Sequence, residues 1–431
     1  MPATIHNPPQ LLGHPRGLFI CFATELWERF SFYGMKYLLL LYLTKYHLFS
    51  DDRGYDTLGA YAGLVYSLPI IGGLLADRYL GMRKAVIFGA ILLTLGHATM
   101  AFEGKQATLY PVGTQLTEPL ALPNGSILAA GAVLTEEIII QDAFALTIFF
   151  FALSLITLGV GFLKPNISAI VGRLYEQNDP RRDAGYTIYY MGINIGAFIA
   201  IILCGWLGET FGWNYGFGAA GIGMLIGLAT FLLGQPWLCG LAEPTRPDAL
   251  KKPVLGPLNL EWVIYLLSLA SLCVIWYLVQ HEKIVHIAQN NLLVVAIVGL
   301  IFYSLHYSNP TQKPDPIAMI FAIASVLSGL LWAWQDNDFG LGLMLVGLIG
   351  FIVYGFKTHD SDEYSRTVIL MILIITSVVF WSLFEQSAGS MTFYADRVLN
   401  REWAGGEIRA SMFGSLNSGF IMLLALPMAY G

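Results

Sequence analysis

The chain has 431 residues, of which 56% are hydrophobic and only 12% are charged. An ordinary soluble domain carries about 25% charged residues, so this composition excludes a soluble globular protein. The net charge of −6 says little, because the acidic residues lie mostly in loops. No basic run indicates a nucleic-acid partner.

Apolar runs of about twenty residues, each long enough to cross a bilayer as a helix, recur along the chain. Six of them precede a polar, proline-containing stretch, near residues 17–47, 56–79, 84–103, 143–172, 184–208 and 215–238. Six follow it, near 261–280, 291–307, 316–334, 339–356, 366–395 and 409–430. The sequence therefore predicts an all-α polytopic membrane protein with twelve apolar segments.

Lysine and arginine are concentrated in alternate loops, and this asymmetry predicts the orientation of the chain. The basic loops follow segments two, four and six, with Arg78, Arg83, Lys84, Arg173, Arg181, Arg182, Arg246, Lys251 and Lys252. Such loops face the cytoplasm, which places the amino terminus there too. The long loop at 104–140 then lies outside, where Asn124 begins a glycosylation sequon in a secretory membrane and is otherwise a polar turn.

Small residues in the apolar segments predict close packing between helices. Gly192-x-x-x-Gly196 and Gly223-x-x-x-Gly227 place glycines one helical turn apart, which lets neighbouring helices approach closely. The four cysteines are interpreted as small packing residues, because they lack metal-ligand spacing: Cys21, Cys204, Cys239 and Cys273. No metal site, disulfide framework or organic cofactor is predicted.

Few ionisable residues lie inside apolar segments, and each of them costs several kcal/mol at the bilayer centre. They are Glu25, Glu28, Arg29 and Lys36 in the first segment, Lys164 in the fourth and Glu385 in the eleventh. On a helical wheel the four charges of the first segment share one face, and Glu25 and Arg29 are one turn apart and able to pair. We predict that this stripe lines a wet pathway; ion pairs that only lock helices together are the alternative.

Polar residues of two other segments extend this prediction. Lys164 precedes Pro165, which removes a backbone hydrogen bond and bends the helix. A lysine that snorkels to the surface is the alternative, but apolar residues still follow it, so we predict a semi-buried lysine suited to a proton-coupled ion pair. Asn194 lies one turn after Tyr190 and offers both a donor and an acceptor to a peptide backbone.

Several motifs in order resemble those of the proton-dependent oligopeptide transporter (POT, or PTR) family. Within the wider major facilitator superfamily, Gly73-Leu-Leu-Ala-Asp-Arg-Tyr-Leu-Gly-Met-Arg-Lys84 resembles a common loop motif. The motifs closer to the POT family are Glu25-Leu-Trp-Glu-Arg-Phe-Ser-Phe-Tyr-Gly34, Phe162-Leu-Lys-Pro-Asn166, Tyr190-Met-Gly-Ile-Asn-Ile-Gly-Ala197, Phe380-Trp-Ser-Leu-Phe-Glu-Gln386 and Ser415-Leu-Asn417.

The resemblance implies roles for residues at matching positions. Glu25, Glu28, Arg29 and Lys164 correspond to proton-coupling residues. The implied substrate-binding residues are Arg29, Tyr33, Tyr66, Lys164, Asn194, Trp381, Glu385 and Asn417. Lys36 takes the place of a basic residue that closes the outer gate against a glutamate, here Glu385.

Three departures from the family pattern qualify these expectations. Phe32 replaces a tyrosine that is common in the first motif, and four apolar segments, rather than two, separate the two sets of core helices. The motifs also place residues 366–430 on the seventh and eighth core helices. We therefore expect an incomplete second bundle, from a truncated or partly represented protein, with a true short variant as the alternative.

The predicted organisation is a major facilitator fold with extra helices between the two bundles. It comprises a cytoplasmic amino terminus (1–16), a six-helix bundle (17–238), a linker with inserted helices (239–358) and the start of the second bundle (359–431). The predicted function is a symporter that couples proton entry to uptake of di- and tripeptides by alternating access, and not an enzyme. The alternatives are a related transporter of nitrate, an amino acid or a drug-like acid, and a non-transporting peptide sensor.

The predicted partners are small peptides, protons and membrane lipid, and we expect a monomer. The resemblance, together with the absence of a histidine from segment two, favours the inner membrane of a bacterium.

Overall fold

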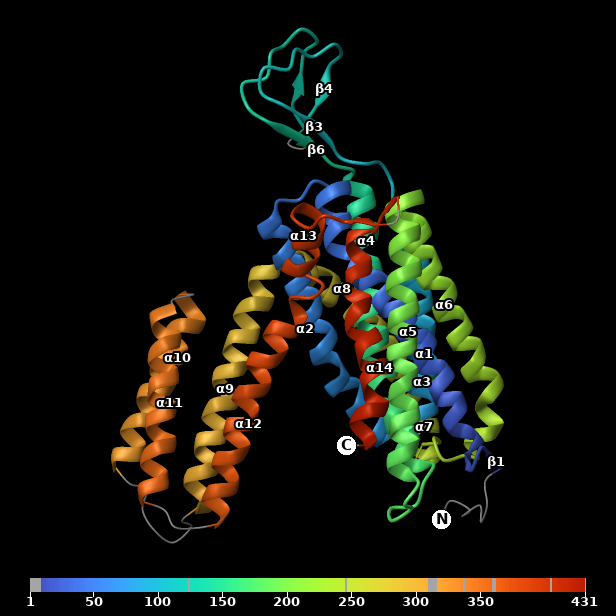
Figure 1. Cartoon of the computed structure of the whole chain (residues 1–431), viewed down its shortest axis with the longest axis vertical. Coiled ribbons are helices and arrows are strands. Elements are labelled where there is room, and N and C mark those ends of the chain that lie inside the picture. Colours follow the sequence, from blue (N-terminus) through green and yellow to red (C-terminus); the bar gives the residue numbers. More distant parts are fainter. Residues whose placement is uncertain are drawn as a thin grey trace. The chain divides into compact units, whose positions relative to one another are not determined.

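The computed structural model describes residues 9–122, 125–244, 246–308, 316–335, 338–358, 362–403 and 405–430. Helices dominate it (Figure 1). Asn124, the predicted glycosylation acceptor, lies outside these residues.

The first half of the chain contains the long helices that were expected from the apolar segments. They are α1 (Arg16–Leu41), α2 (Asp51–Leu75), α3 (Met82–Met100), α4 (Ala143–Arg173), α5 (Arg182–Phe211) and α6 (Trp213–Gly234). A π-helical turn extends α1 (Tyr42–Tyr46) and another extends α2 (Ala76–Leu80). The short strands here are β1 (Gln10–Leu11), β2 (His14–Pro15), β3 (Thr108–Tyr110), β4 (Leu120–Ala121), β5 (Ile127–Leu128) and β6 (Ile138–Ile140).

The second half is also mainly helical. Its helices are α7 (Pro247–Lys251), α8 (Leu260–Gln280), α9 (Glu282–Ser308), α10 (Pro316–Gln335), α11 (Asp338–Thr358), α12 (Asp362–Glu385), α13 (Ser390–Arg397) and α14 (Ser415–Tyr430), with a 3₁₀ turn at Ala410–Gly414. Two hairpins join them, β7 (Pro253–Leu255) with β8 (Leu258–Asn259) and β9 (Glu402–Trp403) with β10 (Gly406–Glu407). The predicted segment 366–395 thus forms two helices, separated by a turn at 386–389.

The chain forms two compact units. One contains residues 1–280 and 387–431, and the other contains residues 281–386. In the smaller unit α10 packs on α9 and α11, α12 contacts α9 and α11, and the core includes Leu348, Phe351 and Val368.

Six helices in the described part of the chain are long and apolar enough to cross a membrane. They are Asp51–Leu80, Ala143–Arg173, Arg182–Phe211, Trp213–Leu238, Leu260–Gln280 and Val368–Arg397, the last of which includes the turn between α12 and α13. Helix α1 is not in this set, and five of its 26 residues are charged: Arg16, Glu25, Glu28, Arg29 and Lys36. All four cysteines are free, with Cys21 and Cys204 buried.

In the larger unit, α1 is enclosed by α5 and α6, and the two glycine motifs explain how. A Cβ atom on Gly196 of α5 would lie 2.2 Å from the carbonyl oxygen of Leu26 on α1. A Cβ on Gly223 of α6 would lie 2.4 Å from the ring of Phe30, again on α1. The predicted close approach at these glycines is confirmed, and the helix that packs against them is α1.

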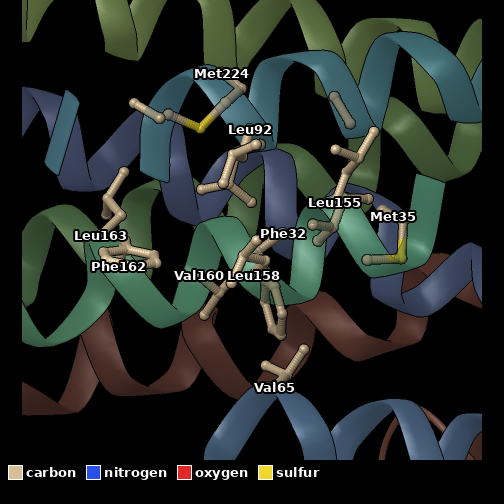
Figure 2. Packing of buried hydrophobic residues seen from close by; sticks show 14 of the residues in the cluster. Phe32, Met35, Val65, Leu92, Leu155, Leu158, Val160, Phe162, Leu163 and Met224 are labelled. Atoms are coloured by element: carbon tan, nitrogen blue, oxygen red, sulfur yellow. The ribbon is translucent and has the colours of Figure 1, made fainter. Parts of the chain in front are cut away.

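The core of the larger unit surrounds α1 with side chains of α2, α3, α4 and α6. Figure 2 shows Phe32 and Met35 of α1 among Leu92, Leu158 and Met224, and each of these five side chains is at most 4% exposed. Helix α3 packs along α4 and α6, while α2 crosses α4. Apolar packing therefore fixes α1, the helix with the charged stripe, at the centre of this unit.

The basic loops gather at one end of the larger unit. Arg83 pairs with Glu243, with its Nε 2.5 Å from Oε1, and its backbone N–H donates to the carbonyl of Ala242. Arg181 donates to the carbonyl oxygen of Gly13 near the start of the chain, at 2.8 Å. The loop after α4 thus contacts the amino-terminal segment, and the start of α3 contacts the stretch after α6.

At the opposite end, residues 387–411 are tied to the ends of α1, α2 and α5. Arg397 donates to both carboxylate oxygens of Asp51, at 2.6 and 2.8 Å. Lys45 pairs with Asp396 at 2.5 Å, and a Glu209 oxygen accepts a hydrogen bond from the backbone N–H of Ser411 at 2.9 Å. Helix α14 then runs beside α5 (Figure 1).

The loop between α3 and α4 forms a small β module, with strands β3–β6 beyond the ends of these helices (Figure 1). Its base is anchored: the N–H of Ala107 donates to the carbonyl of Tyr46 at 2.9 Å, and the side chain of Gln141 donates to the carbonyl of His47 at 2.5 Å. Asp142 caps α4 by accepting from the N–H of Ala145 at 3.0 Å.

The β module contains two related sequence repeats, which were not predicted from the sequence. Gly113-Thr-Gln-Leu-Thr-Glu118 is matched by Gly131-Ala-Val-Leu-Thr-Glu136, at a spacing of 18 residues, from 113 to 131. The N–H of Gly113 donates to the carbonyl of Leu134 at 2.8 Å, and the N–H of Gly131 donates to the carbonyl of Leu116 at 2.7 Å. Each repeat therefore makes the same contact with the other.

Strand pairing follows the same symmetry. Tyr110 of β3 lies opposite Ile138 of β6, and Leu128 of β5 lies opposite Leu120 of β4. At the repeat spacing of 18 residues, Tyr110 is equivalent to Leu128 and Leu120 is equivalent to Ile138, so the two pairs are related by the same symmetry. The module is a pseudo-two-fold pairing of two copies.

Candidate functional site

Three charged residues predicted to couple protons lie within about one turn of α1, and all are buried. Glu25 is 2% exposed, Glu28 is 0% and Arg29 is 4%. The Nε of Arg29 lies 3.0 Å from Glu25 Oε1 and also contacts Glu28 Oε2. A single guanidinium therefore bridges two carboxylates, and the predicted pairing of Glu25 with Arg29 is confirmed.

This group still has unused hydrogen-bonding capacity. Glu25 Oε2, Glu28 Oε1 and Arg29 Nη2 are buried without a hydrogen-bond partner among the residues that the structure describes. Buried polar atoms are normally paired, because an unpaired one costs free energy. The stripe is enclosed rather than open to solvent, so the wet pathway stays a prediction.

Phe32 lies between two cations of the stripe. The Arg29 Cζ is 5.2 Å and the Lys36 Nζ is 5.8 Å from the centroid of its ring. Both distances suit cation–π contacts, and Lys36 is only 4% exposed. The half-buried Tyr33 packs edge-on against Phe32, with 5.4 Å between ring centroids.

Helices α2 and α4 bring two further predicted residues to this group. The Lys164 Nζ lies 4.5 Å from the ring centroid of Tyr66. It is within electrostatic reach of Arg29, Glu28 and Glu25. Glu25, Glu28, Arg29 and Lys164, here called the charge cluster, thus combine two carboxylates with two cations. A proton added to either carboxylate leaves the cations in excess and weakens an ion pair.

Asn194 on α5 is buried, and its side chain uses part of its hydrogen-bonding capacity within the helix. It is 4% exposed, and its Nδ2 donates to the carbonyl of Tyr190 at 3.0 Å. The side-chain oxygen keeps its acceptor capacity. Contact between Asn194 and a peptide stays a prediction.

The remaining predicted residues lie on helices α12 and α14. Trp381 and Glu385 lie on α12 in the smaller unit, where Trp381 packs edge-on against Phe380 and Phe384. Asn417 is exposed on α14. The pocket and gate assigned to these residues, including the pairing of Lys36 with Glu385, stay predictions.

Two buried tyrosines near the charge cluster were missed from the sequence. Tyr189 of α5, 6% exposed, lies beside Glu25. Tyr61 of α2, 1% exposed, lies within electrostatic reach of Glu28 and Arg29. In sequence a buried tyrosine looks like a packing residue, and the only signal was that Tyr61 lies five residues before Tyr66 on the same helix.

A cavity of about 400 Å³ lies between α2, α4 and α8, and its lining contains no ionisable residue. Apolar walls with two serines, Ser268 and Ser271, do not suit the charged termini of a peptide. In the described ranges no group of three His, Cys, Asp or Glu residues could hold a metal ion.

Comparison with known proteins finds a matching family model and similar transporters. The sequence model described as "POT family" matches residues 83–247 and 290–429. The chain is 32% identical over 432 residues to the uncharacterized transporter YclF of Bacillus subtilis, covering 98% of this chain and 68% of that protein. It is 32% identical over 429 residues to the peptide transporter YePEPT of Yersinia enterocolitica, covering 96% and 66%.

A third relative is the dipeptide and tripeptide permease A of Cronobacter turicensis, 26% identical over 414 residues, with 95% of this chain and 62% of the permease covered. The chain therefore spans about two thirds of the length of these relatives, between 62% and 68%.

Solved structures agree on the fold. A crystal structure of a mutant of the peptide transporter POT in complex with alafosfalin matches with a TM-score of 0.61 at 27% identity, covering 98% of this chain and 69% of that one. A bacterial homologue of the human drug peptide transporters PepT1 and PepT2 matches with a TM-score of 0.64 at 22% identity, covering 96% and 71%. The second match supports the fold alone, which is that of the major facilitator superfamily.

Proposed function

Because the chain belongs to the POT family, we propose that the full-length protein is a symporter that couples proton entry to the uptake of di- and tripeptides. It is a multi-pass membrane protein. The observation that carries the proposal is the charge cluster, in which buried carboxylates share one arginine beside a lysine. Such a group suits reversible protonation better than permanent structural pairing.

Coupling follows from the charge balance of the cluster. Protonation of Glu25 or Glu28 leaves Arg29 or Lys164 with a weaker partner, and a peptide carboxylate can then take the free cation. Release of the proton on the other side of the membrane restores the original pairs. This is alternating access driven by ion pairs, and no covalent chemistry on the substrate is involved.

The energy available is sufficient for accumulation. Moving one charge through 100 mV supplies about 2.3 kcal/mol. Since a tenfold ratio corresponds to about 1.4 kcal/mol, one proton supports a concentration ratio of about fiftyfold.

The remaining roles stay part of the proposal. Tyr33, Tyr66 and Asn194 would line the peptide pocket on the first bundle, and Lys36 would close the outer gate against Glu385. Trp381, Glu385 and Asn417 would complete the pocket from the second bundle. We expect a monomer in a bacterial inner membrane, with its amino terminus in the cytoplasm.

The test is uptake of labelled dialanine by liposomes that contain the full-length protein, with and without an inward proton gradient. Gradient-dependent accumulation that unlabelled di- and tripeptides block, and that Glu25→Gln abolishes, supports the symporter. Glu176→Gln, an exposed carboxylate in the loop after α4, is the matched control and should transport normally.

Other outcomes separate the alternatives. Uptake of nitrate, an amino acid or a drug-like acid without competition by peptides would show another substrate. Binding of dialanine by folded protein without any uptake would show a sensor. Uptake that ignores the proton gradient would contradict the proposed coupling.

A further inference from the structure

The hydroxyl of Tyr61 is an unpaired polar group in the interior of the larger unit. Tyr61 is 1% exposed, and its hydroxyl has no hydrogen-bond partner among the described residues. A phenylalanine would fill the same space without an unpaired hydroxyl, so packing alone does not account for a tyrosine.

The surroundings of this hydroxyl are polar. Tyr66, Glu28 and Arg29 lie within its electrostatic reach. Glu28 Oε1 and Arg29 Nη2 are themselves buried and unpaired within the described part of the chain. One buried region between α1 and α2 therefore holds an unpaired acceptor (Glu28 Oε1), an unpaired donor (Arg29 Nη2) and the Tyr61 hydroxyl, which can donate or accept.

We propose that Tyr61 is a positioning residue for proton coupling, which responds to the protonation state of Glu28 and passes the change to the Tyr66–Lys164 contact. The inference rests on the proposed symport and deepens it. In the structure neither the Tyr61 hydroxyl nor Glu28 Oε1 has a hydrogen-bond partner among the described residues. In the proposed switch the two side chains rotate toward each other, and the Tyr61 O–H donates to Oε1 when Glu28 is ionised. When Glu28 carries a proton, that proton is donated to the Tyr61 oxygen, and the tyrosine O–H turns away from the carboxyl.

A hydroxyl is suited to sensing the protonation state of Glu28 because it can donate and accept a hydrogen bond, whereas Arg29 can only donate. Arg29 alone favours the ionised carboxylate. In the proposed switch Tyr61 can pair with Glu28 in either state, and Tyr66, five residues further along the same helix, holds the Lys164 ammonium over its ring at 4.5 Å. A reorientation at Tyr61 therefore reaches the lysine through α2.

Other ionisable groups around Glu28 act at the same time, and the test must allow for them. The charged and titratable groups around Glu28 come from four helices: Cys21, Glu25, Arg29, Tyr33 and Lys36 on α1, Tyr61 and Tyr66 on α2, Lys164 on α4 and Tyr189 on α5.

The first experiment measures proton-driven dialanine uptake against pH for the wild type and for Tyr61→Phe. The hydrogen bond to ionised Glu28 is charge-assisted and therefore stronger than the one from the neutral carboxyl. Losing both should move the midpoint of the pH profile upward, by about one pH unit. Tyr42→Phe removes another buried tyrosine hydroxyl, near the outer end of α1, and should leave the midpoint unchanged. In a Glu28→Gln background, Tyr61→Phe should cause no further shift.

A profile of Tyr61→Phe that superimposes on that of the wild type would overturn the inference, and so would an equal shift in the Glu28→Gln background. A second measurement does not depend on transport: the thermal midpoint of detergent-solubilised protein against pH, without substrate. Coupling predicts curves of different shape for the wild type and Tyr61→Phe, and parallel curves contradict it. If the wild type does not transport dialanine, the proposed function fails, while this comparison still decides the role of Tyr61.

Discussion

Arg29 is the residue on which the charge cluster depends. Its guanidinium contacts both Glu25 and Glu28, and all three side chains are buried. Taking these groups out of water is costly, and their mutual attraction offsets the cost only while the set is complete. The stability of this region is therefore more sensitive to the loss of one partner than to the loss of a surface pair.

Replacement of Arg29 by methionine should test this sensitivity. We expect Arg29→Met to destabilise the protein by about 3–5 kcal/mol, because it leaves two buried carboxylates without their shared cation. Thermal unfolding in detergent measures the change. Arg181→Met, which breaks an exposed pair with Asp179, is the control and should scarcely alter the midpoint. Equal stability of Arg29→Met and the wild type would show that the carboxylates are not both ionised.

Asp142 gives a pH-dependent prediction outside the membrane-spanning segments. The backbone N–H groups of Ala145 and Lys105 donate to its carboxylate and hold the pKa of Asp142 below its usual range. Because the folded pKa lies below the unfolded one, the stabilisation is fully present above about pH 4 and is lost as the pH falls through the folded pKa.

Asp142→Ala should thus cost about 1 kcal/mol at neutral pH, the usual effect of a lost helix cap. Hydrogen exchange of residues 103–145 measures it, corrected for the intrinsic rate at each pH. The difference between the wild type and the variant should shrink from pH 7 to pH 3. Asp183→Ala, at the start of α5 where no side-chain cap forms, should show no such trend, and a constant difference for Asp142→Ala would contradict the prediction.

At the residue scale, the sequence predicts contacts within one helix well and contacts between helices poorly. Glu25 and Arg29 are four residues apart on α1, so their pairing follows from helix geometry. Tyr61 and Tyr189 reach the cluster only because α2 and α5 dock against α1, and helix period alone gives no docking geometry. The contact of Lys164 with Tyr66 depends on the crossing of α2 and α4 in the same way.

At the scale of elements, glycines determine how closely α1 can be held. The same substitution should have opposite effects at two helical glycines. Gly196→Ala places a Cβ 2.2 Å from a backbone oxygen of α1 and should destabilise the protein, displace the charge cluster and reduce uptake. Gly299→Ala on α9 meets nothing within 4 Å and should stabilise its helix by about 0.5–1 kcal/mol. The thermal midpoints of both variants measure these changes in stability. A Gly196→Ala protein as stable as the wild type would show that α1 and α5 do not pack closely at this position.

Helices were predicted better than their interruptions. Apolar runs give the long helices because a membrane-spanning backbone must satisfy its own hydrogen bonds. The turn at 386–389, Gln-Ser-Ala-Gly, is polar but too short to divide the apolar run around it. The short strands of the 104–140 loop contain too few residues for a period to be recognised. The paired repeat there was visible in the sequence as Leu-Thr-Glu at 116–118 and 134–136, but no hydropathy pattern points to it.

At the scale of the whole molecule, the β module is an insertion whose two ends lie together. Thr108 and Ile140 are cross-strand partners, so a two-residue turn can join them. Replacing residues 109–139 by Asn-Gly, a favoured two-residue hairpin turn, should leave the thermal midpoint and dialanine uptake close to those of the wild type. Removing residues 105–141 entirely also deletes the anchors Ala107 and Gln141 and should lower the midpoint. Loss of uptake in the shorter replacement would show that the module takes part in transport.

The symmetry of the module also bears on its ancestry. Each repeat carries both halves of the reciprocal contact, a glycine N–H and a leucine carbonyl, as Gly113 with Leu116 and Gly131 with Leu134 show. Two separate peptides with the sequence of one repeat could therefore form the same pairs as a homodimer. Tandem duplication of the coding segment converts that association into an intramolecular one, in which the effective concentration is set by a short linker and no longer by the amount of protein. Once fused, the copies are free to diverge, and the meeting of Gln115 with Val133, at equivalent positions of the two repeats, is a contact that a homodimer of identical peptides could not make.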